Sequence, residues 1–232
     1  FMSLNSIPNN GKNESTYMDN IPVDNTPVDN TPVDNTPVNN TPVNNTPIDN
    51  TSSNDNNVLI YLVRHGRTEK NFKKSQNESS SDKNSKLDHI GRLQSIIIGQ
   101  YFYSQQNECK LVAVYASPRM RTIQTLDLIL TYAGKNIEMQ TDERLVKSVG
   151  NIKKIKNNFK LLLKTIYERF KGTNGSVLLV THNHIIDFAH KIYSPETYKQ
   201  IKVTNGSISC LCMHNEENVK PVYWNKTVEL EF

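Results

Sequence analysis

Hydrophobic positions are distributed unevenly along the chain. Residues 1–57 contain almost no large apolar side chains at helix or strand spacing, whereas residues 58–232 carry several clear apolar runs. Only the second part has enough apolar sequence to bury a core of its own. The pattern therefore predicts a disordered tail over 1–57, followed by one folded domain over 58–232.

Two kinds of apolar pattern alternate within the predicted domain. Short continuous runs, typical of buried strands, occur at 58–63, 111–116, 177–181 and 208–213. Amphipathic spacing predicts helices at about 88–104, 120–132 and 152–170, with a short helix after the third strand. The polar sequence up to about residue 86 predicts a loop. This alternation favours a three-layer α/β/α fold with a mainly parallel central sheet.

Polar clusters follow three of the predicted strands directly. Arg64, His65 and Gly66 follow the first strand, residues 117–121 follow the second, and residues 181–184 follow the third. Ligands of such sheets bind outside the carboxyl ends of the strands, so these clusters are expected on one rim. Guanidinium groups suit phosphoryl oxygens, and a neutral imidazole among them can attack phosphorus. This set requires no metal, and the sequence shows no carboxylate cluster that would hold magnesium.

Charge divides at the same place as hydrophobicity. Residues 1–57 hold one basic and seven acidic residues, a net charge of −6, whereas the remainder holds 26 basic and 16 acidic residues, a net charge of +10. A domain of this charge attracts phosphorylated substrates, nucleic acid and acidic protein surfaces alike. Lysines at 153, 156, 160 and 164 lie opposite the apolar stripe of the helix predicted at 152–170. They are interpreted as a solvated face, so nucleic acid is a disfavoured partner.

The tail contains a five-residue repeat of the TPVDN type, which occurs six times over residues 21–50. A proline in every unit removes a backbone donor and pushes the preceding residue towards extended geometry. One valine or isoleucine per unit buries too little surface to offset the entropy of ordering the chain. The repeat is interpreted as a drifting low-complexity expansion in preference to a linker or docking array.

Cysteine content and hydropathy bear on the cellular compartment. Cys109, Cys210 and Cys212 form neither an even framework nor a metal-type CxxC pair, which indicates reduced thiols in an intracellular protein. No signal-peptide pattern opens the sequence, and no stretch of about 18 apolar residues occurs. The expected location is therefore the cytoplasm or the nucleus, without a membrane partner.

The stretch LVRHGRTEKN at 62–71 resembles the Arg-His-Gly signature of the histidine phosphatase superfamily, also called the phosphoglycerate mutase-like family. Further segments resemble the motifs of this family in the same order: LDHIGRLQ at 87–94, ASPRMRTIQT at 116–125, VTHNHII at 180–186 and NGSI at 205–208. The resemblance spans most of residues 58–214. It implies a phosphoglycerate mutase-like fold and phosphoryl transfer through a phosphohistidine, without a cofactor.

The resemblance also assigns roles to individual residues. It implies that His65 is the nucleophile, that Arg64 and Arg121 clamp the phosphate, and that His182 donates to phosphoryl oxygens. Four further positions are predicted to bind substrate: Arg67, Asn71, Ser117 and Asn183. Arg119 is interpreted as a nearby surface residue and His184 as part of the pocket lining. The remaining histidines, His89, His190 and His214, have no comparable neighbours in the sequence.

Two features depart from the family pattern. Where many members carry a glutamate that protonates the leaving oxygen, this chain has Lys147, which can donate only with a depressed pKa. Glu143 is the candidate substitute donor, with Asp142 as a second nearby carboxylate. The insertion that usually builds a lid is reduced to a few residues around 149–151, which predicts an open site suited to bulky substrates.

Three functions are compatible with this sequence, in decreasing order of preference. The first is a metal-independent phosphatase that hydrolyses phosphomonoesters or phosphoproteins. The second is a pseudophosphatase that keeps the pocket to bind a phosphorylated partner. The third is a phosphoglycerate mutase, which the short lid disfavours because a mutase must protect its intermediate from water. The sequence leaves the oligomeric state open.

Overall fold

The computed structural model describes residues 56–75, 84–146, 152–198 and 202–229. The predicted tail, apart from its last two residues, and the short lid around 149–151 lie outside these ranges. Among the described helices, none combines the length and the apolar character needed to cross a membrane.

A six-stranded sheet forms the centre of the domain, in the order β3-β2-β4-β1-β5-β6. The strands are β1 (Val58–Arg64), β2 (Leu111–Ala116), β3 (Met139–Thr141), β4 (Ser176–Thr181), β5 (Ile208–Met213) and β6 (Val219–Lys226). Strands β1 to β4 run parallel to one another, whereas β5 pairs antiparallel with β1 and β6 pairs antiparallel with β5. The mainly parallel sheet predicted from sequence is confirmed, with an antiparallel edge added to it.

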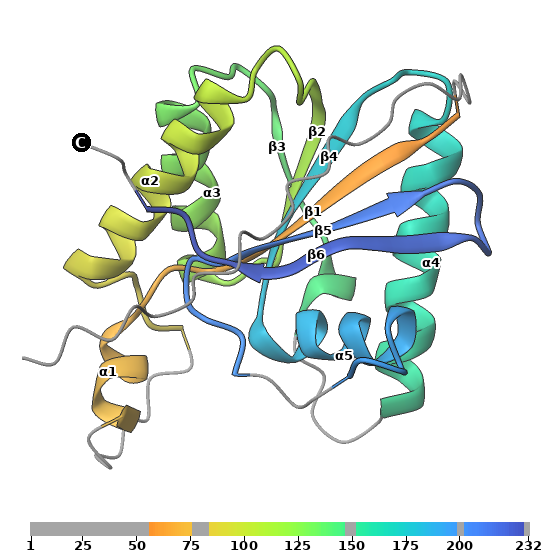
Figure 1. Cartoon of the computed structure of the whole chain (residues 1–232). Helices are drawn as coiled ribbons and strands as arrows, with labels where there is room; N and C mark the ends of the chain where they lie inside the picture. The colour runs from red at the N-terminus through yellow and green to blue at the C-terminus, as the bar shows by residue number, and fades with distance from the viewer. Residues whose placement is uncertain (1–55, 76–83, 147–151, 199–201, 230–232) are drawn as a thin grey trace, which may run out of the picture. The chain divides into compact units, whose positions relative to one another are not determined.

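Helices cover both faces of this sheet, which confirms the three-layer α/β/α arrangement. Helices α2 (His89–Ser104) and α3 (Met120–Tyr132) lie together on one face, and α4 (Ile152–Phe170) and α5 (Asn183–Tyr193) lie on the other (Figure 1). Helix α2 begins at a clear cap, because the side chain of Asp88 accepts a hydrogen bond of 2.8 Å from the backbone N–H of Gly91.

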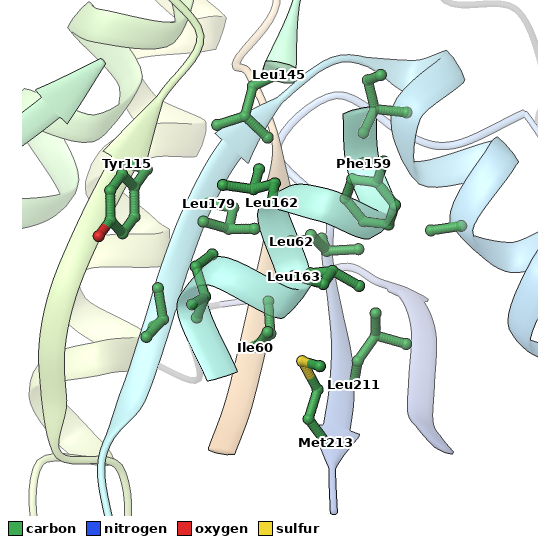
Figure 2. Packing of buried hydrophobic residues seen from close by; sticks show 14 of the residues in the cluster. Ile60, Leu62, Tyr115, Leu145, Phe159, Leu162, Leu163, Leu179, Leu211 and Met213 are labelled. Carbon is green, nitrogen blue, oxygen red and sulfur yellow. The ribbon is translucent and has the colours of Figure 1, made fainter. Parts of the chain in front are cut away.

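The sheet buries side chains on both faces. On β1, Ile60 and Leu62 join the core under α4 and α5, whereas Tyr61 and Val63 join the core under α2 and α3. This alternation explains why the strand appears in the sequence as a continuous apolar run. Figure 2 shows the α4 side of the core, which includes Phe159, Leu162 and Leu163 from α4, Leu179 from β4 and Leu211 from β5.

Three elements were not anticipated from the sequence. Residues predicted as loop contain the short helix α1 (Glu69–Ser75), and β3 and β6 extend the two edges of the sheet. Helix α1 is polar and has no apolar stripe, so its hydrophobic period gives no helix signal. Strand β6 contains Pro221 and is only partly buried, as expected of an edge strand, which carries a weak apolar pattern.

Candidate active site

The carboxyl ends of β1, β2 and β4 meet at one edge of the sheet, as predicted. Arg64 pairs in register with Thr181, and Ala116 pairs with Val180. Two backbone hydrogen bonds extend this pairing beyond the strands, from His65 N to the Thr181 carbonyl and from Ser117 N to the Val180 carbonyl, at 3.1 and 3.0 Å. The side chains that follow the three strands therefore converge. We call Arg64, His65, Ser117, Arg121 and His182 the rim cluster.

Hydrogen bonds on both ring nitrogens fix the tautomer of His65. The Nδ1 atom lies 2.8 Å from the carbonyl oxygen of Gly66, which can only accept, so Nδ1 carries the hydrogen. The Nε group of Arg121 donates to Nε2 at 3.2 Å, so Nε2 carries the lone pair. The nucleophilic nitrogen of His65 thus faces the guanidinium group of Arg121.

Arg121 also fixes the second histidine of the rim cluster. Its Nη2 atom lies 3.3 Å from His182 Nδ1, and because a guanidinium can only donate, Nδ1 is the acceptor. The Nε2–H of His182 then donates to the Ser117 hydroxyl at 2.9 Å. The two imidazole rings lie 5.3 Å apart, at 66° to each other. A single arginine therefore sets the orientation of both rings.

Both imidazoles are held in the neutral form. His65 is 5% exposed and His182 is 3% exposed. Burial lowers the pKa of His65 to about 3, helped by the charges of Arg121 and Arg64 and opposed by the hydrogen bond to Gly66. Burial likewise lowers the pKa of His182 to about 2, with neighbouring His65 and Arg121 acting in the same direction. A neutral imidazole keeps a lone pair on one ring nitrogen, which is the form able to act as a nucleophile.

Arg64 adds a second cation beside Arg121. Its Nη1 group donates to the Val203 carbonyl, and burial, with a smaller contribution from the charge of Arg121, lowers its pKa to about 10. Its buried Nε has no hydrogen-bond partner among the described residues. Two close guanidinium groups repel each other, and an anion between them would relieve this repulsion and occupy the open donor.

Close backbone packing holds the loop that carries His65. A side-chain carbon at Gly66 would come within 2.3 Å of the Gly91 carbonyl oxygen, and one at Gly91 within 1.9 Å of the Arg67 carbonyl oxygen. Only two glycines allow the loop and the start of α2 to approach this closely. This close approach explains why the first and second motifs carry glycine at Gly66 and Gly91.

Two amides tie the same loop to other segments. Gln94 accepts from the backbone N–H of Arg67 at 2.9 Å, and Asn205 donates to the His65 carbonyl at 3.0 Å. Sequence reasoning assigned no site role to either residue, although both lie within the motifs quoted above. Their position in those motifs was the available signal, and the structure shows that they position His65.

The residues predicted to bind substrate differ in their surroundings. Asn71 accepts from the Thr68 hydroxyl at 2.9 Å, which leaves its amide N–H₂ group to serve as a donor. Asn183 has a buried Oδ1 without a hydrogen-bond partner among the described residues. Arg67 instead forms an ion pair of 2.7 Å with Asp88, and Arg119 lies exposed at the start of α3. The roles of Arg67, Asn71 and Asn183 in binding substrate stay predictions.

Of the candidate proton donors, Lys147 lies outside the described residues. The segment before it reaches the rim, because Asp142 N donates to the Ala116 carbonyl at 2.9 Å and the Thr181 hydroxyl donates to the Leu145 carbonyl at 2.9 Å. Asp142 forms an ion pair of 2.6 Å with Arg144. Glu143 begins a short 3-10 helix, residues 143–145, and is exposed. Of Asp142 and Glu143, only Asp142 forms an ion pair within the described residues.

The described residues contain no group of three or more histidine, cysteine or acidic side chains that could hold a metal ion. All three cysteines are free thiols, and burial raises the pKa of each. The rim cluster itself consists of imidazole, guanidinium and hydroxyl groups.

Comparison with known proteins agrees with this site. Residues 60–158 match the model of the histidine phosphatase superfamily (branch 1). This segment holds Arg64, His65 and Arg121, while His182 lies beyond it. No curated protein matches the chain significantly.

Solved structures of low sequence identity share the fold. A phosphoglycerate mutase from Bacillus anthracis str. Sterne has a TM-score of 0.63 at 16% identity, over 75% of this chain and 96% of that protein. A mycobacterial glucosyl-3-phosphoglycerate phosphatase has a TM-score of 0.57 at 14% identity, over 73% and 99%. A phosphoserine phosphatase mutant from Entamoeba histolytica, in complex with phosphoserine, has a TM-score of 0.56 at 18% identity, over 73% and 98%.

Proposed function

We propose, from the confirmed resemblance to the histidine phosphatase superfamily, that residues 58–232 form a phosphatase that works through a phosphohistidine. Its substrates would be phosphomonoesters or phosphoproteins. One observation carries this proposal: His65 is buried and neutral, and its Nε2 lone pair faces Arg121 at 3.2 Å. An imidazole with a structural role alone would not need its reactive nitrogen held beside two cations.

The geometry supports a two-step reaction. A phosphate ester would enter between Arg64 and Arg121, whose N–H groups would turn from the histidine nitrogens towards the phosphoryl oxygens. His65 Nε2 would attack phosphorus, forming a P–N bond as the bond to the leaving oxygen breaks. Water would then attack the phosphohistidine, releasing inorganic phosphate and restoring the neutral imidazole.

His182 would assist this transfer electrostatically. Its neutral state depends on burial and on positive neighbours. An arriving phosphate dianion places negative charge beside the ring and favours its protonated form. Protonated His182 would offer Nδ1–H to a phosphoryl oxygen while Nε2–H remains bonded to Ser117, which lies 2.9 Å away.

The leaving oxygen also needs a proton, unless it is a weak base. Asp142 is engaged with Arg144, and Glu143 is exposed, so neither is a buried carboxylic acid without an ion-pair partner. This observation favours one second candidate function, a pseudophosphatase that binds a phosphorylated partner. A mutase is the least favoured function, because the lid segment in the sequence is short.

Two substrates separate the phosphatase from the pseudophosphatase. Phenolate leaving groups need little protonation, whereas alkoxides need an acid, so an aryl phosphate is expected to be hydrolysed much faster than an alkyl phosphate. The activity should persist in excess chelator and vanish in His65→Ala. If neither ester is hydrolysed while wild-type protein still binds phosphate, the phosphatase proposal fails and the binding function stands.

Restoring the family's carboxylate tests the origin of this selectivity. Lys147→Glu should raise turnover of the alkyl ester by about tenfold or more, because general acid catalysis typically contributes 10²–10⁴-fold. Turnover of the aryl ester should change little. Lys153→Glu makes the same charge change a few residues away and is the matched control. Equal gains in both variants would show that only net charge matters.

A further inference from the structure

A cavity of about 580 Å³ lies between α4 and α5, outside the rim cluster. Its lining includes the apolar side chains of Ile155, Phe188 and Ile192 and the cationic side chains of Lys156 and Lys191. The other lining residues are His184, Asp187 and Tyr198. Its volume falls within the range of about 300–1,000 Å³ that is usual for small-molecule sites. On α5, the lining residues recur at three- and four-residue steps and form one stripe of the helix.

His184 connects this cavity to the rim cluster. Its ring stacks on that of His182, with centroids 6.3 Å apart and planes at 11°. The ring of His182 in turn lies 5.3 Å from that of His65, measured between centroids. His184, which lines the cavity, is therefore a ring neighbour of the histidine that contacts the phosphoryl group in the proposed reaction.

The lining residues indicate what the cavity would hold. Half-buried Phe188 and Ile192 provide an apolar wall, and exposed Lys156 and Lys191 bring two positive charges to it. Asp187, the carboxylate of the lining, accepts a hydrogen bond of 3.2 Å from the Tyr198 hydroxyl. The lysines and the aspartate of the lining give it a formal net charge of +1, since there are two lysines and one aspartate. An apolar body with an anionic group matches this wall better than a neutral sugar or a cation.

We propose that this cavity is the leaving-group subsite of the enzyme and that it selects phosphate esters of bulky apolar or aromatic alcohols that carry a second anionic group. The proposal rests on the phosphatase function above and deepens it. Lys156 and Lys191 would bind the second anion, while Phe188 would contact the apolar body. Small hydroxy-acid phosphates would leave most of the cavity unfilled and would be poorer substrates.

A matched pair of substrates tests the charge preference. Wild-type protein should hydrolyse a carboxynaphthyl phosphate with a higher kcat/KM than naphthyl phosphate. In Lys191→Gln and in Lys156→Gln, this ratio should fall by up to about fivefold, the upper end of the effect expected of an exposed ion pair. Lys153→Gln alters a lysine on α4 that does not line the cavity and should leave the ratio unchanged. A ratio unaffected by Lys156 and Lys191 overturns the proposal.

A binding measurement keeps this test separate from that of the phosphatase function. Hydroxynaphthoate, the alcohol product, should bind wild-type protein more tightly than naphthol, as followed by its own fluorescence, and Lys191→Gln should reduce the difference. Phe188→Leu, compared at equal thermal stability, should weaken both ligands alike. If no ester is hydrolysed but these binding differences appear, the phosphatase function fails while the cavity remains a binding site. If hydrolysis occurs without them, the cavity assignment fails alone.

Discussion

Two parts of the proposed site differ in how their side chains are arranged. The phosphoryl half is the rim cluster around His65, and the leaving-group half is the segment that carries the candidate proton donors Asp142 and Glu143. Around His65, both imidazoles are buried and hydrogen-bonded: Arg121 contacts the two rings, and Ser117 accepts from His182. In the leaving-group half, Glu143 is exposed and Asp142 is bound to Arg144. Preorganised charge accounts for most catalysis of acyl and phosphoryl transfer. Under the proposed function, this contrast predicts efficient capture of a phosphoryl group and slow release of a basic alcohol.

The largest effect should come from removing the arginine shared by the two histidines. Arg121→Ala deletes the proposed phosphate clamp and one contact of each ring, so kcat/KM for an aryl phosphate should fall by about 10³-fold or more. Arg119→Ala, two residues earlier and exposed, is the control and should lose little activity. Similar losses in the two variants would show that the phosphoryl half is not organised around Arg121.

Acid should destabilise the phosphoryl half because its histidines fold in the neutral form. In the unfolded chain these groups titrate near 6.5, whereas the folded pKa values are about 3 and about 2. Below pH 6.5 the unfolded state therefore binds more protons, and stability falls as pH falls. Between pH 6.5 and 5.0, each histidine should lower the free energy of unfolding by about 1.5 kcal/mol.

Urea unfolding of wild type and of a His65→Gln, His182→Gln double variant measures how much the two histidines contribute to the pH dependence of stability. The double variant should lose about 3 kcal/mol less than wild type over the same pH interval. Phosphate must be left out, because an anion would stabilise the charged form. Identical pH slopes would mean that the histidines are solvated and can ionise in the folded protein.

The smallest effect is expected in the leaving-group half. If Glu143 supplies the proton despite its exposure, Glu143→Gln should lower kcat for an alkyl phosphate by about tenfold and leave the aryl phosphate unaffected. Glu138→Gln, another exposed glutamate nearby, is the control. An unchanged alkyl rate would remove Glu143 from consideration and leave protonation to Lys147 or to solvent, which would sharpen the contrast between the two halves.

The placement of the rim cluster could be predicted from sequence because it follows from topology. Buried runs end directly before Arg64, Ser117 and His182, and parallel strands bring such ends together. The arrangement within the cluster could not be predicted. The hydrogen on Nδ1 of His65 follows from its contacts with neighbouring Gly66 and with Arg121, and Arg121 is 56 positions away and meets the ring only in the fold.

Other features lacked a sequence signal for physical reasons. Helix α1 is short and polar, so it has no hydrophobic period, and β6 is an edge strand with little buried surface. The ion pair between Asp142 and Arg144 depends on the local turn, in which Asp142 also accepts from the backbone N–H of Arg144. The sequence placed both carboxylates near the site without showing that one of them is already engaged.

Trapping of the covalent intermediate is the most direct test of whether His65 becomes phosphorylated. Wild-type protein is mixed with radiolabelled phenyl phosphate, quenched in alkali within milliseconds to seconds, and digested for mass spectrometry. We expect up to one acid-labile, alkali-stable phosphate per chain, attached to Nε2 of His65 and missing from His65→Ala. Steady hydrolysis without any label on His65, or with label on another residue, would contradict it.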